Sequence, residues 1–239
     1  MKNIAPYTVS EPFPGLYVID EGGVRCFLIP GEDKALLIDT GFGRGDLAAQ
    51  VREITDLPVR VVHTHADGDH MGTDAQFEDI SMHPAEYDHF AMSLERMKLD
   101  KAALLSRVSP VWEGDKLSYG DYCFEIILIP GHTPGSIAFL DRAHRLLIGG
   151  DSIQTGEAWM FGPGRSMYAY YQSMKKLEAL RPAFDTVLAS HVDLLVDADI
   201  LPELVEGAKA YLDGALEGQP FNGPAPAKIY SFKRARFLC

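Results

Sequence analysis

The chain alternates short apolar runs with segments of helical periodicity, in the order strands, helices, strands, helices. The apolar runs are rich in Val, Ile, Leu or Phe and are bounded by Gly, Pro or Asp, as β-strands are. No Ser/Pro/Gly-rich linker and no repeat of fixed period interrupts this order. We therefore predict a single α/β domain over residues 1–239, with two sheets face to face and helices outside them.

The expected elements follow from this periodicity. The expected strands cover Leu16–Asp20, Val24–Pro30, Lys34–Thr40, Val59–His63, Tyr122–Pro130, Ser136–Asp141, Arg145–Gly149 and Thr186–Ser190. The expected helices cover Asp46–Asp56, Pro84–Val108 with a break near Leu99–Asp100, Met167–Leu180 and Ile200–Leu216. We expect Lys228–Leu238 to form a short C-terminal hairpin. Its basic cluster Lys233–Arg236 would protect a solvated edge against strand addition, with contact to an acidic group of a substrate as the alternative.

Composition limits the partners and the compartment. The 239 residues carry a net charge of −12, and a chain this acidic repels phosphate backbones and anionic lipids. No run reaches the ~18 apolar residues that span a membrane, and the N-terminus lacks the apolar run of a signal peptide. The three widely spaced cysteines fit a reducing compartment. We expect a cytoplasmic protein that binds neither nucleic acid nor membrane; its oligomeric state stays open.

The densest group of metal-binding residue types is His65-Ala66-Asp67-Gly68-Asp69-His70. It leaves an apolar strand for a loop in which Gly68 allows the backbone to turn tightly. Alternation would place His65, Asp67 and Asp69 on one side, with His70 offset. That arrangement suits two adjacent metal ions better than one.

Three later residues have the same character, because each is a polar residue at the end of an apolar strand. His132 lies in a Pro-Gly-His-Thr-Pro-Gly loop, Asp151 follows two glycines, and His191 follows the strand at 186–190. A rigid scaffold presents side chains to a site at such positions.

Together these elements resemble the metallo-β-lactamase superfamily, whose pattern is His-x-His-x-Asp-His, then His, then Asp, then His. The resemblance covers roughly Gly15–Asp193, and includes the turn Ile38–Gly41 and the loop Gly131–Gly135. It implies a four-layer αββα sandwich with a metal site at one edge of the sheets.

The resemblance also implies a ligand set and a chemistry. Metal 1 would be held by His65, Asp67 and His132, metal 2 by Asp69, His70 and His191, and Asp151 would bridge both. The family hydrolyses substrates with a metal-bound hydroxide, because two metals lower the pKa of water and polarise the scissile group. Asp69 would orient the hydroxide, and Asp67 would help to hold metal 1. Asp69 and Asp67 are the predicted catalytic residues.

The second His of the family motif is Asp67 here. A register shifted to His63-Thr64-His65-Ala66-Asp67 restores His-x-His-x-Asp but puts Gly68 where a His ligand is required. We prefer the register that starts at His65. In that register His63 would not bind the metal but would contact the ligand residues. A carboxylate at position 67 tilts the metal preference toward Fe or Mn over Zn.

Other residues near the motifs are weaker candidates. His83 precedes Pro84 and is expected to act as a helix cap or as a donor that supports a ligand. Trp159, Tyr168 and Tyr171 follow Asp151 and are candidate substrate contacts, with helix core as the alternative for the tyrosines. His89 and His144 are expected to be exposed.

The leading hypothesis is a hydrolase with two divalent metal ions (Zn, Fe or Mn) that acts on a small-molecule ester, thioester, lactone or phosphoester. One alternative is a diiron oxidoreductase or dioxygenase on the same fold, suggested by the carboxylate at position 67. The other is a catalytically inactive binding module. The sequence does not identify the substrate.

Overall fold

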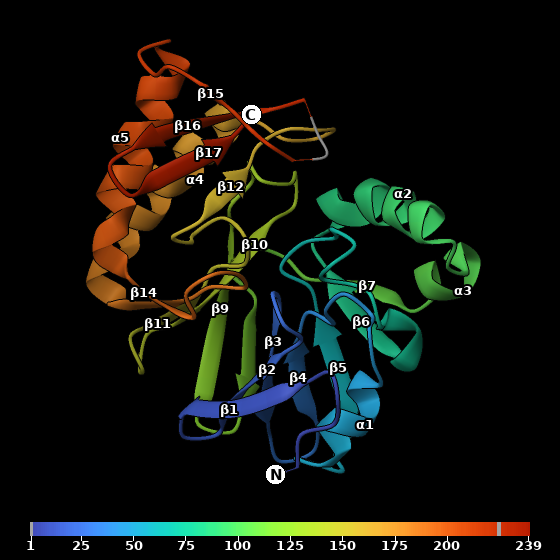
Figure 1. Ribbon diagram of the computed structural model, residues 1–239. Coiled ribbons are helices and arrows are strands. Elements are labelled where there is room, and N and C mark those ends of the chain that lie inside the picture. Colours follow the sequence, from blue (N-terminus) through green and yellow to red (C-terminus); the bar gives the residue numbers. More distant parts are fainter. Residues whose placement is uncertain (1, 224–225) are drawn as a thin grey trace. The chain divides into compact units, whose positions relative to one another are not determined.

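The computed structural model describes residues 2–223 and 226–239, and the chain forms two compact units, residues 1–126 and 127–239 (Figure 1). Each unit combines β-sheet with helices, so the mixed α/β class predicted from the sequence is confirmed. That the two units act as one domain stays a prediction.

The first unit contains a sheet of seven strands in the order β1-β2-β3-β4-β5-β6-β7. These are β1 (Thr8–Phe13), β2 (Leu16–Asp20), β3 (Arg25–Pro30), β4 (Ala35–Ile38), β5 (Val59–Val62), β6 (Asp79–Met82) and β7 (Val108–Pro110). Strands β1 to β4 pair antiparallel, and β4 to β7 pair parallel. Because β4 and β5 run in the same direction, the loops that follow them leave from the same edge of the sheet.

Helices supply the crossovers that parallel strands require. Helix α1 (Leu47–Arg52) connects β4 to β5, while α2 (Tyr87–Met97) and α3 (Lys101–Leu105) lie between β6 and β7. Short 3-10 turns η1 (Asp74–Gln76) and η2 (Pro84–Glu86) precede β6 and α2, and β8 (Lys116–Tyr119) follows β7. The break expected near residues 99–100 is therefore confirmed.

The core of the first unit forms between one face of this sheet and its helices. Leu28, Leu37 and Val61 from the sheet pack in one cluster with Phe90 and Leu94 from α2, and all five are fully buried. Truncating a buried Phe such as Phe90 to Ala costs about 3–5 kcal/mol. The core thus fixes α2 against the strands whose ends carry the motif.

The second unit is built on β10 (Ile137–Asp141), β11 (Leu146–Ile148), β13 (Thr186–Leu188) and β14 (Leu195–Asp197). Its sheet has the order β14-β13-β11-β10-β9-β8, and the division between the units falls inside β9 (Tyr122–Leu128). Strands β11 and β13 are parallel, so their carboxyl ends share an edge. Helices α4 (Met167–Leu180) and α5 (Leu201–Leu212) lie side by side and cover this sheet with Met174, Leu177 and Leu204 (Figure 1). Turns η3 (Arg181–Ala183) and η4 (Ala198–Ile200) follow α4 and precede α5.

The C-terminal hairpin is confirmed as β16 (Lys228–Phe232) and β17 (Ala235–Leu238). The prediction that its basic cluster guards an open edge is wrong. Strand β12 (Glu157–Trp159) pairs with β17 in a sheet of order β12-β17-β16-β15, with β15 at Gln219–Pro220. The charges are paired instead: Lys233 contacts Glu206, and Arg234 contacts Asp199 and Glu203.

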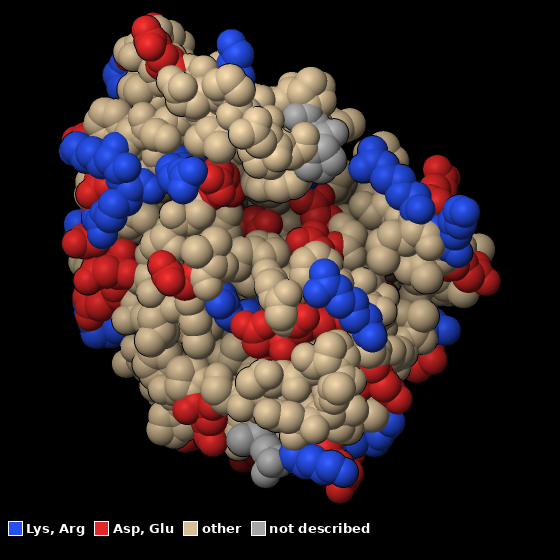
Figure 2. Space-filling view, viewed as in Figure 1, with Lys and Arg blue, Asp and Glu red and all other residues tan. Residues whose placement is uncertain are grey.

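The charged surface is mixed. On the face seen in Figure 2, Lys and Arg side chains are interspersed with Asp and Glu side chains. Within the described residues, no helix has both the length and the apolar character needed to cross a membrane.

Candidate metal centre

The first group of candidate ligands lies in the loop that follows β5. His65, Asp67, Asp69 and His70 come together there: His65 Nε2 lies 3.6 Å from Asp67 Oδ2, and His70 Nε2 lies 3.8 Å from Asp69 Oδ2. The rings of His65 and His70 are 4.1 Å apart between centroids. Both histidines are buried, while the two carboxylates are partly exposed.

The other ring nitrogen of each histidine is engaged. His70 Nδ1 lies 2.8 Å from Asp39 Oδ2, and His65 Nδ1 lies 2.9 Å from Thr64 Oγ1. In metal sites the nitrogen that does not bind the metal is held by such a partner, which fixes the ring orientation. Each imidazole therefore offers Nε2 next to a carboxylate, a donor set that fits a divalent metal ion.

Asp39 organises this arrangement from the end of β4. It has a positive φ of 62°, and its carboxylate accepts hydrogen bonds from Thr64 N at 2.8 Å and Thr64 Oγ1 at 2.7 Å. Burial alone would raise the pKa of Asp39, but His70 and His63 hold it well below its usual range. Asp39 is therefore a buried carboxylate that stays ionised.

His63 lies between two carboxylates rather than among the candidate ligands. Its Nε2 is 3.1 Å from Asp74 Oδ2, its Nδ1 is 3.4 Å from Asp39 Oδ1, and the ring is fully buried. Burial lowers the pKa of His63, but Asp74 and Asp39 together raise it to about 9. These contacts support the register that starts at His65, which stays a prediction.

Close backbone approach positions His70. Thr40 N donates to His70 O at 2.7 Å, and Gly72 N donates to Gly41 O at 2.8 Å. A side chain at Gly72 would collide with the backbone of Phe42 and Gly43. The turn after β4 and the loop after β5 are thus joined directly, which explains why both stretches carry motif residues.

The structure confirms the expected capping role of His83 but contradicts the expected exposure of His89. His83 Nδ1 accepts a hydrogen bond from Ala85 N at 3.2 Å, capping η2, and its ring packs edge-on against Trp112. Its support of a ligand stays a prediction. The expectation that His89 is exposed is wrong, because it is buried with Nε2 2.6 Å from Asp67 Oδ1.

The second group of candidate ligands follows strands of the second unit. His132 Nε2 lies 3.7 Å from Asp151 Oδ2, and His191 Nε2 lies 3.3 Å from Asp151 Oδ1. His132 Nδ1 donates to the main-chain oxygen of Trp159 at 2.9 Å. Here too, the histidine whose Nδ1 is held presents Nε2 to a carboxylate.

Gly131 fixes the loop of His132 against α4. Its φ of 147° lies in a region that other residues rarely adopt, and a Cβ there would collide with the backbone of Tyr170. Ser166 N, at the start of α4, donates to Gly131 O at 2.9 Å. The loop can lie this close to the helix because position 131 has no side chain.

The predicted substrate contacts separate into two kinds. Trp159 is 44% exposed, and its ring lies 5.3 Å from that of Phe161 and 6.2 Å from that of Phe221. Tyr168 is exposed on α4, whereas Tyr171 packs against the core of the second unit. Sequence reasoning missed Phe221, because it is distant along the chain from the other two aromatic residues.

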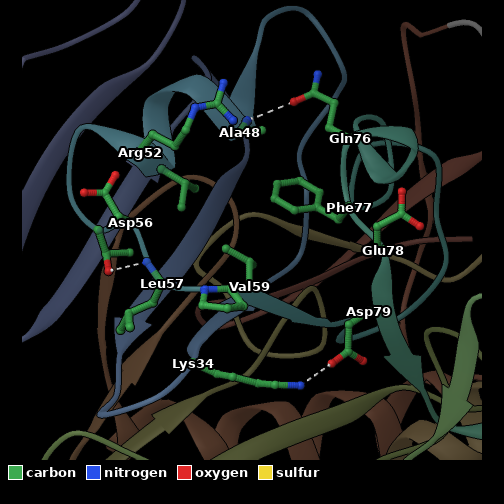
Figure 3. A pocket seen from close by; sticks show the side chains of 13 residues that line it. Lys34, Ala48, Arg52, Asp56, Leu57, Val59, Gln76, Phe77, Glu78 and Asp79 are labelled. Carbon is green, nitrogen blue, oxygen red and sulfur yellow. Dashed lines mark hydrogen bonds and ion pairs between the residues drawn. The ribbon is translucent and has the colours of Figure 1, made fainter.

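A surface cavity of about 400 Å³ lies elsewhere in the first unit (Figure 3). It is lined by the first residues of β5 and β6, Val59 and Asp79, and by residues of α1, with Lys34 Nζ 3.1 Å from Asp79 Oδ2. The candidate ligands follow the opposite, carboxyl end of β5. The cavity therefore does not belong to the metal centre.

Comparison with known proteins identifies the family. Residues 19–191 match the family model described as the metallo-beta-lactamase superfamily. The chain belongs to this superfamily. A metallo-beta-lactamase from Pontibacter korlensis superposes with a TM-score of 0.67 at 16% identity, over 85% of this chain and 99% of that one. The predicted metallo-β-lactamase-like fold is confirmed.

Two curated relatives are named for hydrolytic activities. The acyl-coenzyme A thioesterase MBLAC2 of Gallus gallus is 28% identical over 207 residues, 73% of this chain and 75% of that protein. The hydroxyacylglutathione hydrolase of Xanthomonas axonopodis pv. citri is 29% identical over 177 residues, 72% of this chain and 61% of that protein. The protein is a metal-dependent hydrolase, as the sequence predicted.

Proposed function

We propose that the two groups of ligands form one binuclear centre that hydrolyses the thioester bond of a small molecule. Metal 1 would be held by His65, Asp67 and His132, metal 2 by Asp69, His70 and His191, with Asp151 between them. The observation that carries the proposal is shared by both units: histidines with an anchored Nδ1 present Nε2 beside a carboxylate. The order of the ligands along the chain follows the family pattern.

Two divalent ions held there would lower the pKa of a water molecule and polarise the thioester carbonyl. Asp69 is partly exposed, so its carboxylate can accept a hydrogen bond from the attacking water and take up its proton. The water oxygen adds to the acyl carbon, the carbon–sulfur bond breaks, and the proton goes to the departing sulfur. The products are a carboxylic acid and a thiol.

A thioester is favoured over an ester, lactone or phosphoester because both relatives are named for thioester substrates. The exposed ring of Trp159, with Phe161 and Phe221, offers an apolar surface. Since the Trp159 carbonyl holds His132, this surface is tied to a candidate ligand. We propose that it contacts an apolar acyl group; contacts from Tyr168 and Tyr171 are weaker proposals.

The metal is proposed to be Zn, Fe or Mn, with the carboxylate of Asp67 favouring the harder ions. A small-molecule substrate and a cytoplasmic location, without nucleic acid or membrane partners, belong to the same proposal. The net charge of −12 supports this view of the partners.

The test is metal analysis of natively purified wild type and Asp67→Ala, followed by a substrate panel. We expect about two metal ions per chain, fewer in the variant, and faster hydrolysis of acyl-CoA or S-acylglutathione than of lactones and phosphodiesters. One metal ion per chain at saturation would contradict the binuclear site. Iron content with oxygen-dependent turnover and no hydrolysis would favour the oxidoreductase instead, and failure to take up any metal would favour a binding module.

A further inference from the structure

Three side chains of η2 and α2 form hydrogen bonds with the loop at Ala66 and Asp67. Glu86 Oε2 accepts a hydrogen bond from Ala66 N at 2.9 Å, and Ser93 Oγ donates to Ala66 O at 2.8 Å. Between them, His89 Nε2 lies 2.6 Å from Asp67 Oδ1. Positions 86, 89 and 93 are spaced three and four residues apart, so they share one helical face. All three side chains are buried.

The two carboxylate oxygens of Asp67 lie next to different histidines. Oδ1 faces His89, while Oδ2 lies 3.6 Å from His65 Nε2, the nitrogen proposed to bind metal 1. Asp67 therefore lies between two imidazoles. Position 67 is also the one at which the motif departs from the family pattern.

We propose that His89 is a positioning residue that makes Asp67 a one-oxygen metal ligand. The Nε2–H of His89 donates to Oδ1 and restrains rotation of the carboxylate, so that Oδ2, beside His65 Nε2, would be the oxygen available to a metal ion. This inference rests on the proposed function, since it requires metal 1. It assigns to α2 a role in metal binding, exerted through Asp67, that the sequence motif does not contain.

Two physical arguments favour this role over helix packing alone. The contact is short and His89 is buried, whereas packing would be satisfied by an apolar side chain of the same size. Hydrogen-bond partners of metal ligands typically contribute about 10–100-fold in metal affinity. Glu86 and Ser93 bond to the main-chain N and O of Ala66, whereas His89 contacts the side chain of Asp67.

The experiment compares His89→Gln, which keeps a donor, with His89→Leu, which removes it. Zn²⁺ affinity is measured by competition with a chromophoric chelator, and the Co²⁺-substituted proteins are compared by their visible spectra. We expect His89→Leu to weaken binding of one ion by about 10–100-fold and to change the Co²⁺ spectrum. His89→Gln should recover most of the affinity and a spectrum like that of wild type. His89→Phe, a flat ring without a donor, is the second variant should the leucine not fold.

A second comparison separates positioning from folding. In an Asp67→His background the motif has the family residue, so His89→Leu should cost much less metal affinity there. His144→Ala, which removes a histidine that contacts Asp141, is the matched control and should leave affinity unchanged. Urea unfolding of the metal-free proteins checks that each variant is folded.

Three results would overturn the inference: wild-type affinity in His89→Leu and His89→Phe, a glutamine variant as weak as leucine, or an equal loss in the Asp67→His background. Failure of the proposed function looks different. In that case wild type itself takes up no Zn²⁺, or Asp67→Ala binds as well as wild type.

Discussion

The two units hold their candidate ligands by different means. In the first unit, four candidate ligands come from one loop, His65 to His70. The buried carboxylate of Asp39 holds His70, and the buried imidazole of His89 holds Asp67. In the second unit, three ligands come from three separate loops, and a main-chain carbonyl holds His132. A single substitution can remove a side chain that supports a ligand, but none removes a carbonyl. The first group should therefore be sensitive to side-chain changes, and the second to changes of backbone geometry.

The largest expected effect is that of Asp39→Asn. Asn tolerates the positive φ of this position, so the backbone is retained while the charge is lost. His63 and His70 then lose a buried partner, and breaking a buried pair typically costs about 3–5 kcal/mol. We expect the free energy of unfolding in urea to fall by that order, together with the Zn²⁺ content.

Asp185→Asn is the control for a carboxylate that is exposed. Asp185 pairs with Arg145 at the surface of the second unit, where ion pairs contribute little. Its urea midpoint and Zn²⁺ content should stay close to those of wild type. Equal losses in the two variants would show that Asp39 has no special role.

The second effect in size is that of Gly131→Ala, which changes backbone geometry in the second unit. Strain at such a φ costs about 1–3 kcal/mol, and the new Cβ also collides with Tyr170. Gly162 has a φ of 105° with open space around it, so Gly162→Ala carries the strain without the collision. Urea unfolding should show a larger loss at 131, and metal content should fall only there. Equal losses at both positions would mean that the close approach to α4 does not hold His132.

Features that depend on local sequence patterns could be predicted from the sequence. Helix α4 was expected at the residues where it is found, because Arg181-Pro182 close it. The structure adds that the Ser166 side chain accepts a hydrogen bond from Ala169 N and caps its start. The candidate ligands after β5, β11 and β13 were predicted because a polar residue that follows an apolar run can be recognised in the sequence alone. Strands β6 and β7 were missed because they are short and carry Asp, Ser and Pro.

The residues that support the ligands were harder to foresee. Asp39 was noticed only as part of a turn, and its bonds to Thr64 and His70 depend on the parallel pairing of β4 with β5. His89 was expected at the surface because nothing near it in the sequence suggests a partner. Its partner, Asp67, is 22 residues away and is reached only when α2 packs on the sheet. Contacts of this kind require the tertiary structure.

The smallest expected effect on metal binding is that of Trp159→Ala. This variant tests whether the main chain, and not the side chain, of Trp159 holds His132 in the second unit. The variant keeps the carbonyl that holds His132, so the Zn²⁺ affinity should match that of wild type. It removes the ring that lies beside Phe161 and Phe221, so KM for a thioester with an apolar acyl group should rise. An aromatic contact contributes about 0.5–1.5 kcal/mol, which corresponds to roughly twofold to tenfold in KM. Trp112→Ala is the control, since Trp112 is also exposed but contacts only the capping residue His83 among the rings described. A loss of Zn²⁺ affinity in Trp159→Ala would show that the indole itself, and not the main chain, orients His132.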